Sequence, residues 1–321
     1  MILDEVDDQV SGISIAIPLA LLAVMLAAVA VQSGLVAWRS PHHSIASPDV
    51  ISVAPRSFHY RDHAEYFRAG LAVDAPRLLI AVDTPLTIMK YQVSRAEYDR
   101  CVQDNACSPA ESEEPASPGD TPVVGVSYDD TVRYAAWLSE HTGQSWILPT
   151  DQQLAFAAGS RFPDDALGVA SDDKNPAIRW LADYEREARR SASKDPLPQI
   201  RGSFGASEYG LADFAGNIWE WTRSCSKRIE IDAQAVAQGA DPSRCGILIA
   251  SGKHRAPMSS FVRIPKGGGC SVGSPPDNLG FRLVRQPSSF EVEKDWIKRT
   301  AGLITVSINA VSPNEDLRHE D

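Results

Sequence analysis

The sequence predicts an irregular α+β domain that follows one transmembrane helix. Short apolar runs separated by turn residues, including 21 glycines and 22 prolines among 321 residues, are typical of a domain built from many short strands. Helix-start signals do not alternate regularly with strands, which argues against repeated βαβ units. Residues 9–38 carry no charge, and 13–31 is almost continuously apolar, which matches the roughly 20 residues that a membrane-spanning helix needs.

The N-terminal part divides into a segment at 1–12, a transmembrane anchor or signal sequence at 13–38, and a linker at 39–54. The run is either an uncleaved anchor or a signal peptide cut after Ala30, which would release a secreted protein. The acidic N-terminus disfavours a signal peptide. Arg39 favours a cytoplasmic domain, but the cysteines described below favour export. We therefore expect a single-pass inner-membrane protein with its domain in the periplasm.

The domain is expected at 55–286, where local signals locate several elements. Residues 78–93 predict two strands broken at 83–85. Four helices are predicted: at 95–103, between a cap at Ser127 and a stop at Gly143, at 154–158, and at 175–190. Ser94 with Glu97 forms a capping box before the first helix, and Thr150 with Gln153 forms one before the third.

The charge balance excludes one class of partner. The formal net charge is −11 and no basic stripe occurs, whereas nucleic-acid binding needs clustered Lys and Arg to neutralise phosphates. Residues 287–321 are more polar on the whole and predict a C-terminal tail. The apolar run makes the membrane an expected partner, and a family resemblance implies the other, an exported protein or polypeptide substrate.

The segment 205–225 is the densest turn in the chain. It places five turn-permissive residues around a Trp-Glu-Trp core: Gly205, Gly210, Asp213, Gly216 and Asn217. Glycine tolerates positive φ and a close approach of backbones, so this composition predicts a tightly folded loop. Acidic side chains in such a loop are candidates for holding a cation.

Several motifs occur together in the order known from one family. They are Tyr-Gln-Val-Ser-Arg-Ala-Glu-Tyr at 91–98, Pro-Val-Val-Gly-Val-Ser at 122–127, Trp-Ile-Leu-Pro-Thr at 146–150, Gly-Leu-Ala-Asp-Phe-Ala-Gly-Asn-Ile-Trp-Glu-Trp at 210–221, and Asn-Leu-Gly-Phe-Arg-Leu-Val at 278–284. The chain thereby resembles the sulfatase-modifying-factor family, whose founder is the formylglycine-generating enzyme. The resemblance implies an irregular fold related to C-type lectins, bound calcium and, in many members, an extracytoplasmic location.

The resemblance also implies a calcium site in the dense turn. The family's ligands correspond to the side chains of Asp213 and Glu220 and to the backbone carbonyls of Gly216 and Ile218. Calcium takes six to eight oxygens from such mixed donors. The alternative is that Asp213 is an ordinary turn residue and that Glu220 points to water from a strand. We expect the calcium site.

Five cysteines predict two disulfides and one remaining thiol. Cys101 and Cys107 bracket a short turn, and Cys225 and Cys245 enclose an insertion that a bridge would close. Bridges fit an exported protein, while five free thiols would fit the cytosol. We expect the two bridges, which leaves Cys270.

Cys270 is the candidate catalytic residue, and it lacks a partner. In the family's oxidases, two thiolates five residues apart hold Cu(I), and a substrate cysteine is oxidised to formylglycine. Here the corresponding region is Lys-Gly-Gly-Gly-Cys-Ser-Val-Gly at 266–273, and the segment that should carry both thiolates is shortened. One thiolate cannot form that site, so copper is not expected and an enzyme activity is uncertain.

Two further groups of residues that include histidine are not expected to carry chemistry. His59, His63 and Glu65 resemble an iron-binding pattern of related sulfoxide synthases, but residues four apart on a strand lie about 13 Å apart and cannot share an ion. His254, beside Lys253 and Arg255, is expected at the surface.

The shortened cysteine region, Arg-Cys-Val at 100–102 and Asn-Pro-x-x-Arg-Trp at 175–180 resemble one branch of the family. Its members are accessory proteins encoded beside copper nitrite reductases. The resemblance implies a membrane-tethered factor that assists maturation or assembly of an exported enzyme. The alternatives are an oxidase that acts on sulfatase cysteines and a calcium-dependent, lectin-like ligand-binding module.

Overall fold

A computed structural model describes residues 45–111, 118–168, 175–192, 197–231, 245–265, 276 and 278–287, together with residues 21, 22, 25 and 29. Cys270, the segment 1–12, nearly all of the expected anchor 13–38 and the tail after Pro287 lie outside the described residues. Within the described part of the chain, no helix has the length and apolarity needed to cross a membrane.

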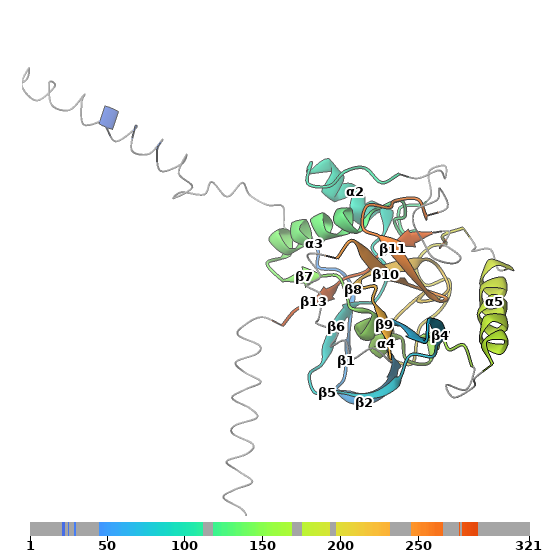
Figure 1. Ribbon diagram of the computed structural model, residues 1–321. Helices are drawn as coiled ribbons and strands as arrows, with labels where there is room; N and C mark the ends of the chain where they lie inside the picture. Colours follow the sequence, from blue (N-terminus) through green and yellow to red (C-terminus); the bar gives the residue numbers. More distant parts are fainter. Residues whose placement is uncertain are drawn as a thin grey trace, which may run out of the picture. The chain divides into compact units, whose positions relative to one another are not determined.

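The domain is a mixed α+β structure, as the sequence predicts, and its strands form four small sheets (Figure 1). One sheet contains β1 (Val50–Val53), β6 (Leu86–Met89), β13 (Val284–Arg285) and β7 (Trp146–Ile147), in that order. A second contains β11 (Arg255–Ser259), β10 (Ile247–Ser251), β8 (Trp219–Cys225) and β12 (Leu279–Gly280). Residues 50–53, at the end of the expected linker 39–54, instead belong to the domain as β1, which pairs with β6.

The two remaining sheets contain two and three strands. β2 (Arg56–Arg61) pairs with β5 (Arg77–Val82), and β3 (Glu65–Arg68) lies between β4 (Leu71–Val73) and β9 (Arg228–Glu230). β5 and β6 are the two strands predicted at 78–93, and Asp83, Thr84 and Pro85 separate them.

All four predicted helices are present: α2 (Arg95–Gln103), α3 (Tyr128–Thr142), α4 (Asp151–Ala158) and α5 (Pro176–Ala192). Capping boxes begin the first three, at Ser94, Ser127 and Thr150. In each, the cap side chain accepts a backbone N–H of the first turn and satisfies a donor that the helix cannot. Gly143 ends α3 in the left-handed conformation at φ 65°, where a side chain would be strained.

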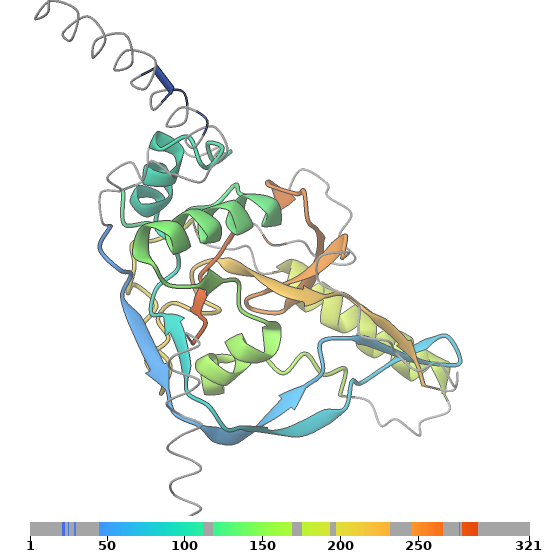
Figure 2. The same cartoon turned by 90° about the vertical axis from the view of Figure 1, so that its left-hand side faces the viewer.

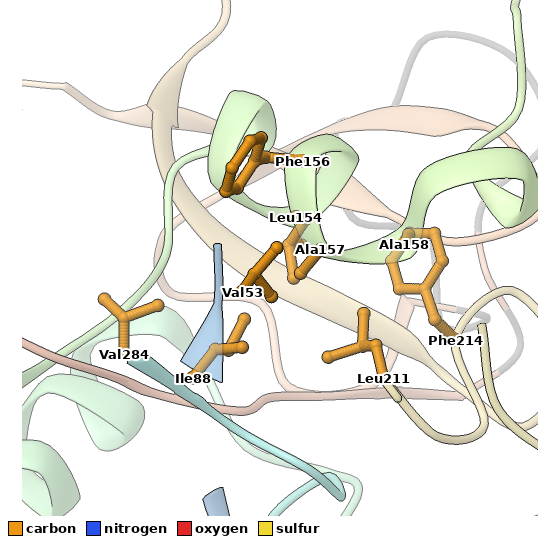
Figure 3. Packing of buried hydrophobic residues seen from close by; sticks show 9 residues of the cluster. All are labelled: Val53, Ile88, Leu154, Phe156, Ala157, Ala158, Leu211, Phe214 and Val284. Atoms are coloured by element: carbon orange, nitrogen blue, oxygen red, sulfur yellow. The ribbon is translucent and has the colours of Figure 1, made fainter. Parts of the chain in front are cut away.

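The hydrophobic core lies between the first sheet and α4 (Figure 3). Val53, Ile88 and Val284 project from three adjacent strands against Leu154 and Phe156 of the helix. Leu211 and Phe214 close the cluster from the dense turn. Figure 2 shows α4 lying over the strands from a second direction, with α3 above them. The part of 205–225 that precedes β8 is therefore packed against the core through Leu211 and Phe214.

Candidate functional site

The dense turn is held by backbone groups that converge on Asp213. This residue adopts φ 62°, a left-handed conformation that the local hydrogen bonds support. Its carboxylate accepts the N–H groups of Gly202 at 2.6 Å and Phe204 at 2.9 Å. Its carbonyl accepts the N–H of Asn217 at 3.2 Å. The Asp213 side chain thus fastens one loop to another, as an N–H acceptor.

Glu220 lies on β8 and is fully buried, not directed to water. Its two carboxylate oxygens accept Nε and Nη2 of Arg282, both at 2.6 Å. Gln92 Nε2 donates to the same carboxylate at 2.8 Å. A buried carboxylate needs such partners, because removing an unpaired charge from water is very costly.

Arg282 is also fully buried and uses its whole guanidinium. Besides Glu220, it donates to the carbonyls of Met89, Lys90 and Ala212, at 3.3, 2.8 and 2.9 Å. This one side chain therefore joins β8, the end of β6 and the dense turn. Sequence reasoning missed its role, although an arginine inside the apolar Gly-Phe-Arg-Leu-Val run is itself a signal of a buried ion pair.

Two of the four residues expected to bind calcium already have protein partners, and the calcium site stays a prediction. Of the four expected ligands, Ile218 is buried just before β8, and Gly216 donates its N–H to the Asp213 carbonyl at 3.3 Å. The carboxylates of Asp213 and Glu220 already have protein donors. Among the described residues, Gln92 Oε1 is the buried side-chain oxygen without a donor.

A second buried polar cluster centres on Asp151, the first residue of α4. Its carboxylate accepts the Tyr60 hydroxyl at 2.7 Å, Arg255 Nε at 2.9 Å and the Ser251 hydroxyl. Burial raises the pKa of Tyr60 well above its usual range, and the Asp151 charge adds to the rise. The neutral tyrosine is therefore a donor and not a nucleophile near neutral pH.

His63 connects this cluster to a cavity. Its Nδ1 lies 3.1 Å from the Tyr60 hydroxyl, and its Nε2 lies 3.1 Å from the Cys225 carbonyl. The cavity, of 260 Å³, is bounded by residues of β3, β4, β11 and α5. His59 belongs instead to β2 and lines a different cavity. Among the described residues, no group of three His, Cys, Asp or Glu side chains is arranged to hold a metal.

His254 corrects another expectation. It is buried, not at the surface, and its ring meets the Trp219 ring edge-on with centroids 5.3 Å apart. Trp219 Nε1 donates to the His254 carbonyl at 3.0 Å. The neighbouring charged residues gave a misleading signal, because the chain turns between β10 and β11 at this point.

Both expected disulfides are present. Cys101 bonds to Cys107 with Cα atoms 5.3 Å apart, and Cys225 bonds to Cys245 with Cα atoms 5.8 Å apart. The first closes the end of α2, and the second joins the end of β8 to the residues before β10. Four of the five cysteines are thereby used, and Cys270 is the fifth.

Comparison with known proteins identifies a family model, described as the sulfatase-modifying factor enzyme 1-like domain, that matches residues 38–287. The inactive C-alpha-formylglycine-generating enzyme 2 of Bos taurus is 28% identical over 177 residues, covering 53% of this chain and 54% of that protein. The formylglycine-generating enzyme of Mycobacterium tuberculosis is 31% identical over 186 residues, covering 52% and 58%. The chain thus spans little more than half the length of these relatives.

Among solved structures, PvdO from Pseudomonas aeruginosa aligns with a TM-score of 0.48 and 17% identity, covering 75% of this chain and 95% of that one. That score is too low to support an argument about function.

Proposed function

Because this chain belongs to the sulfatase-modifying factor enzyme 1-like family, we propose that it is an exported, membrane-tethered accessory protein. On this proposal it assists the maturation or assembly of an extracytoplasmic enzyme and does not itself oxidise cysteine. The inner membrane holds it through 13–38, and the domain lies in the periplasm; cleavage of that segment would instead release it.

The use of the cysteines carries this proposal. Two disulfides take four of the five thiols, so Cys270 is the one thiol left for metal binding. The family's oxidase chemistry, as the resemblance implies it, needs two thiolates on one Cu(I), a soft ion that prefers sulfur. Two disulfides also fit export, because thiols in the cytosol are kept reduced.

The dense turn supports a scaffolding role. Asp213, Glu220 and Arg282 are fully buried. Asp213 accepts the Gly202 N–H, and Arg282 donates to Glu220 and to the Ala212 carbonyl. None of the three is therefore free to bind substrate or transfer a proton. A rigid turn of this kind keeps the adjoining protein surface in one conformation. Such preorganisation lowers the entropy cost of binding a partner protein. The bovine relative carries the word inactive in its name, which agrees with a family member that has lost the oxidase reaction.

The partner that we propose is an enzyme containing copper, of the nitrite reductase type, because of the shortened cysteine region and the Asn-Pro-x-x-Arg-Trp motif at 175–180. The test is deletion of this chain in its host, followed by complementation. We expect the copper reductase to lose activity and the Cys270→Ser variant to restore it as fully as the unaltered chain. Unchanged reductase activity and copper content after deletion would refute this partner.

The second candidate is an oxidase that forms formylglycine, and the relative from Mycobacterium tuberculosis favours it. Purified full-length chain is incubated with Cu(I), oxygen and a cysteine peptide of the sulfatase type. The accessory function predicts neither oxygen consumption above the copper-only control nor an aldehyde in the peptide. Aldehyde formation that Cys270→Ser abolishes would establish the oxidase instead.

A further inference from the structure

Helix α5 has its charged face turned toward the domain and its apolar face turned away. It lies at the margin of the domain (Figure 1), where β4 is its neighbour. An amphipathic surface helix normally shows the opposite arrangement, with the apolar face on the core. The apolar outer face of α5 is therefore a candidate binding surface.

The inner face of α5 carries ion pairs, some within the helix and one to Asp165. Arg190 Nη2 lies 2.9 Å from Asp165, and its Nη1 lies 2.6 Å from Glu187. Arg186 pairs with Asp183 and also donates to the Asp165 carbonyl at 3.4 Å. These groups line the 260 Å³ cavity beneath the helix. Arg186 and Arg190 thus attach α5 to Asp165 of the domain, while their pairs with Asp183 and Glu187 lie within the helix.

The outer face exposes four large apolar side chains at helical spacing. The exposed fractions are 44% for Ile178, 67% for Trp180, 50% for Leu181 and 61% for Tyr184. The two aromatic rings stack with centroids 5.7 Å apart and planes 16° apart. Side chains three and four residues apart lie on one side of a helix, so these four form one continuous patch, which we call the α5 patch.

We propose that the α5 patch binds the surface of a lipid bilayer, with the helix lying in the plane of the interface. Trp and Tyr favour the headgroup region, where an apolar ring and a polar tip are both satisfied, and Leu and Ile reach the acyl boundary. The exposed charges beside the patch are Glu185 and Arg189, one of each sign. Apolar contact, not lipid charge, therefore drives the binding.

The size of the α5 patch argues against a second copy of the chain. From their exposed fractions, its four side chains offer on the order of 450 Å², whereas a stable dimer buries about 800 Å² on each partner. A bilayer needs no matching surface and accepts a convex helix. The membrane tether proposed above would keep the domain close to the bilayer and so raise the local concentration of lipid around it. The binding of α5 to lipid does not itself depend on that tether.

The experiment uses the full chain in phosphatidylcholine vesicles that contain a diazirine-bearing phosphatidylcholine. After illumination, lipid adducts are located by mass spectrometry of the peptides. We expect adducts on 176–192, reduced about tenfold in the Trp180→Ser/Tyr184→Ser double variant, which is the loss expected for two anchoring aromatic rings. The control is Leu79→Ser/Phe261→Ser, which removes two other exposed apolar side chains and should leave the α5 adducts unchanged.

The two membrane proposals fail separately. Adducts on 13–38 without adducts on 176–192 would overturn the α5 inference and leave the tether intact, and the reverse pattern would overturn the tether alone. Labelling of α5 that appears only when phosphatidylglycerol is added, or that about 0.5 M salt removes, would show electrostatic attraction and overturn apolar insertion. Protection of α5 from lipid together with dimeric sedimentation would assign the α5 patch to a second copy; protection in a monomer would also overturn the inference.

Discussion

The carboxylate of Glu220 and the guanidinium of Arg282 form a doubly hydrogen-bonded ion pair with no solvent exposure. The two residues are 62 positions apart in the chain, and the pair joins β8 to the residue two positions beyond β12. Gln92, in the segment between β6 and α2, adds a third part of the chain to the same carboxylate. The ion pair is therefore fully shielded from solvent.

Replacing Arg282 by Met should lower the free energy of unfolding by about 3–5 kcal/mol, because it leaves the Glu220 carboxylate buried without its counter-charge. The double variant Arg282→Met/Glu220→Met should lose less than the single variant, since no buried charge remains. It will not recover fully, because three carbonyls lose their donor. Urea unfolding followed by circular dichroism measures all three proteins. A double variant less stable than Arg282→Met would contradict this account.

Calcium should leave the thermal unfolding midpoint unchanged. Both expected carboxylate ligands are already held by protein donors, and exchange for calcium would break the Glu220–Arg282 pair. The measurement is differential scanning calorimetry with excess calcium and with a chelator. A calcium-dependent rise in the midpoint that Asp213→Ala removes would restore the calcium site that the motif implies, and with it the lectin-like function.

Tyr60→Phe should cost about 1–3 kcal/mol at neutral pH, because the buried Asp151 carboxylate loses a donor. Burial raises the pKa of Tyr60 in the folded protein, so the folded state holds this proton more tightly than the unfolded chain. That stabilisation is complete below the unfolded pKa of about 10 and is lost as the pH rises above it.

The stability difference between the unaltered protein and Tyr60→Phe should therefore narrow above about pH 10. The check is urea unfolding of both proteins at a series of pH values. The control is Tyr184→Phe, which alters an exposed hydroxyl on α5. A gap that stays constant through this range would mean that Tyr60 ionises equally in the folded and unfolded states.

Removing the Cys225–Cys245 bridge should destabilise the domain more than removing Cys101–Cys107. The bridges close chain separations of 20 and 6 residues, and loop entropy gives about 3 and 2 kcal/mol respectively. Paired Cys→Ser variants, unfolded in urea without reductant, provide the measurement. Equal losses would show that local packing outweighs loop length here.

Local chemistry predicted the helices well. The capping boxes at Ser94 and Thr150 and the stop at Gly143 depend on residues within one turn, so a sequence contains all the information that places them. The break between β5 and β6 at Pro85 is equally local. The disulfides followed from the positions of four cysteines around two loops.

Contacts between distant segments were not predictable in the same way. Glu220 meets Arg282, and Tyr60 meets Asp151 across 91 positions. Nothing near Glu220 in the sequence distinguishes a calcium ligand from one member of an ion pair. His254 was misplaced for a related reason, because its burial depends on Trp219, which comes from another strand. Strand β1 was missed because its partner, β6, begins more than thirty residues later.

The Cys225–Cys245 bridge has a consequence for how the domain tolerates change. Residues 225 and 245 are fastened with Cα atoms 5.8 Å apart, so β8 and β10 keep their register whatever length of chain joins them. Lengthening a closed loop costs little, only about 0.6 kcal/mol for each doubling. The covalent bridge thus lets the part of this connection that follows β9 change in length at little cost to stability, while β9 keeps its pairing with β3.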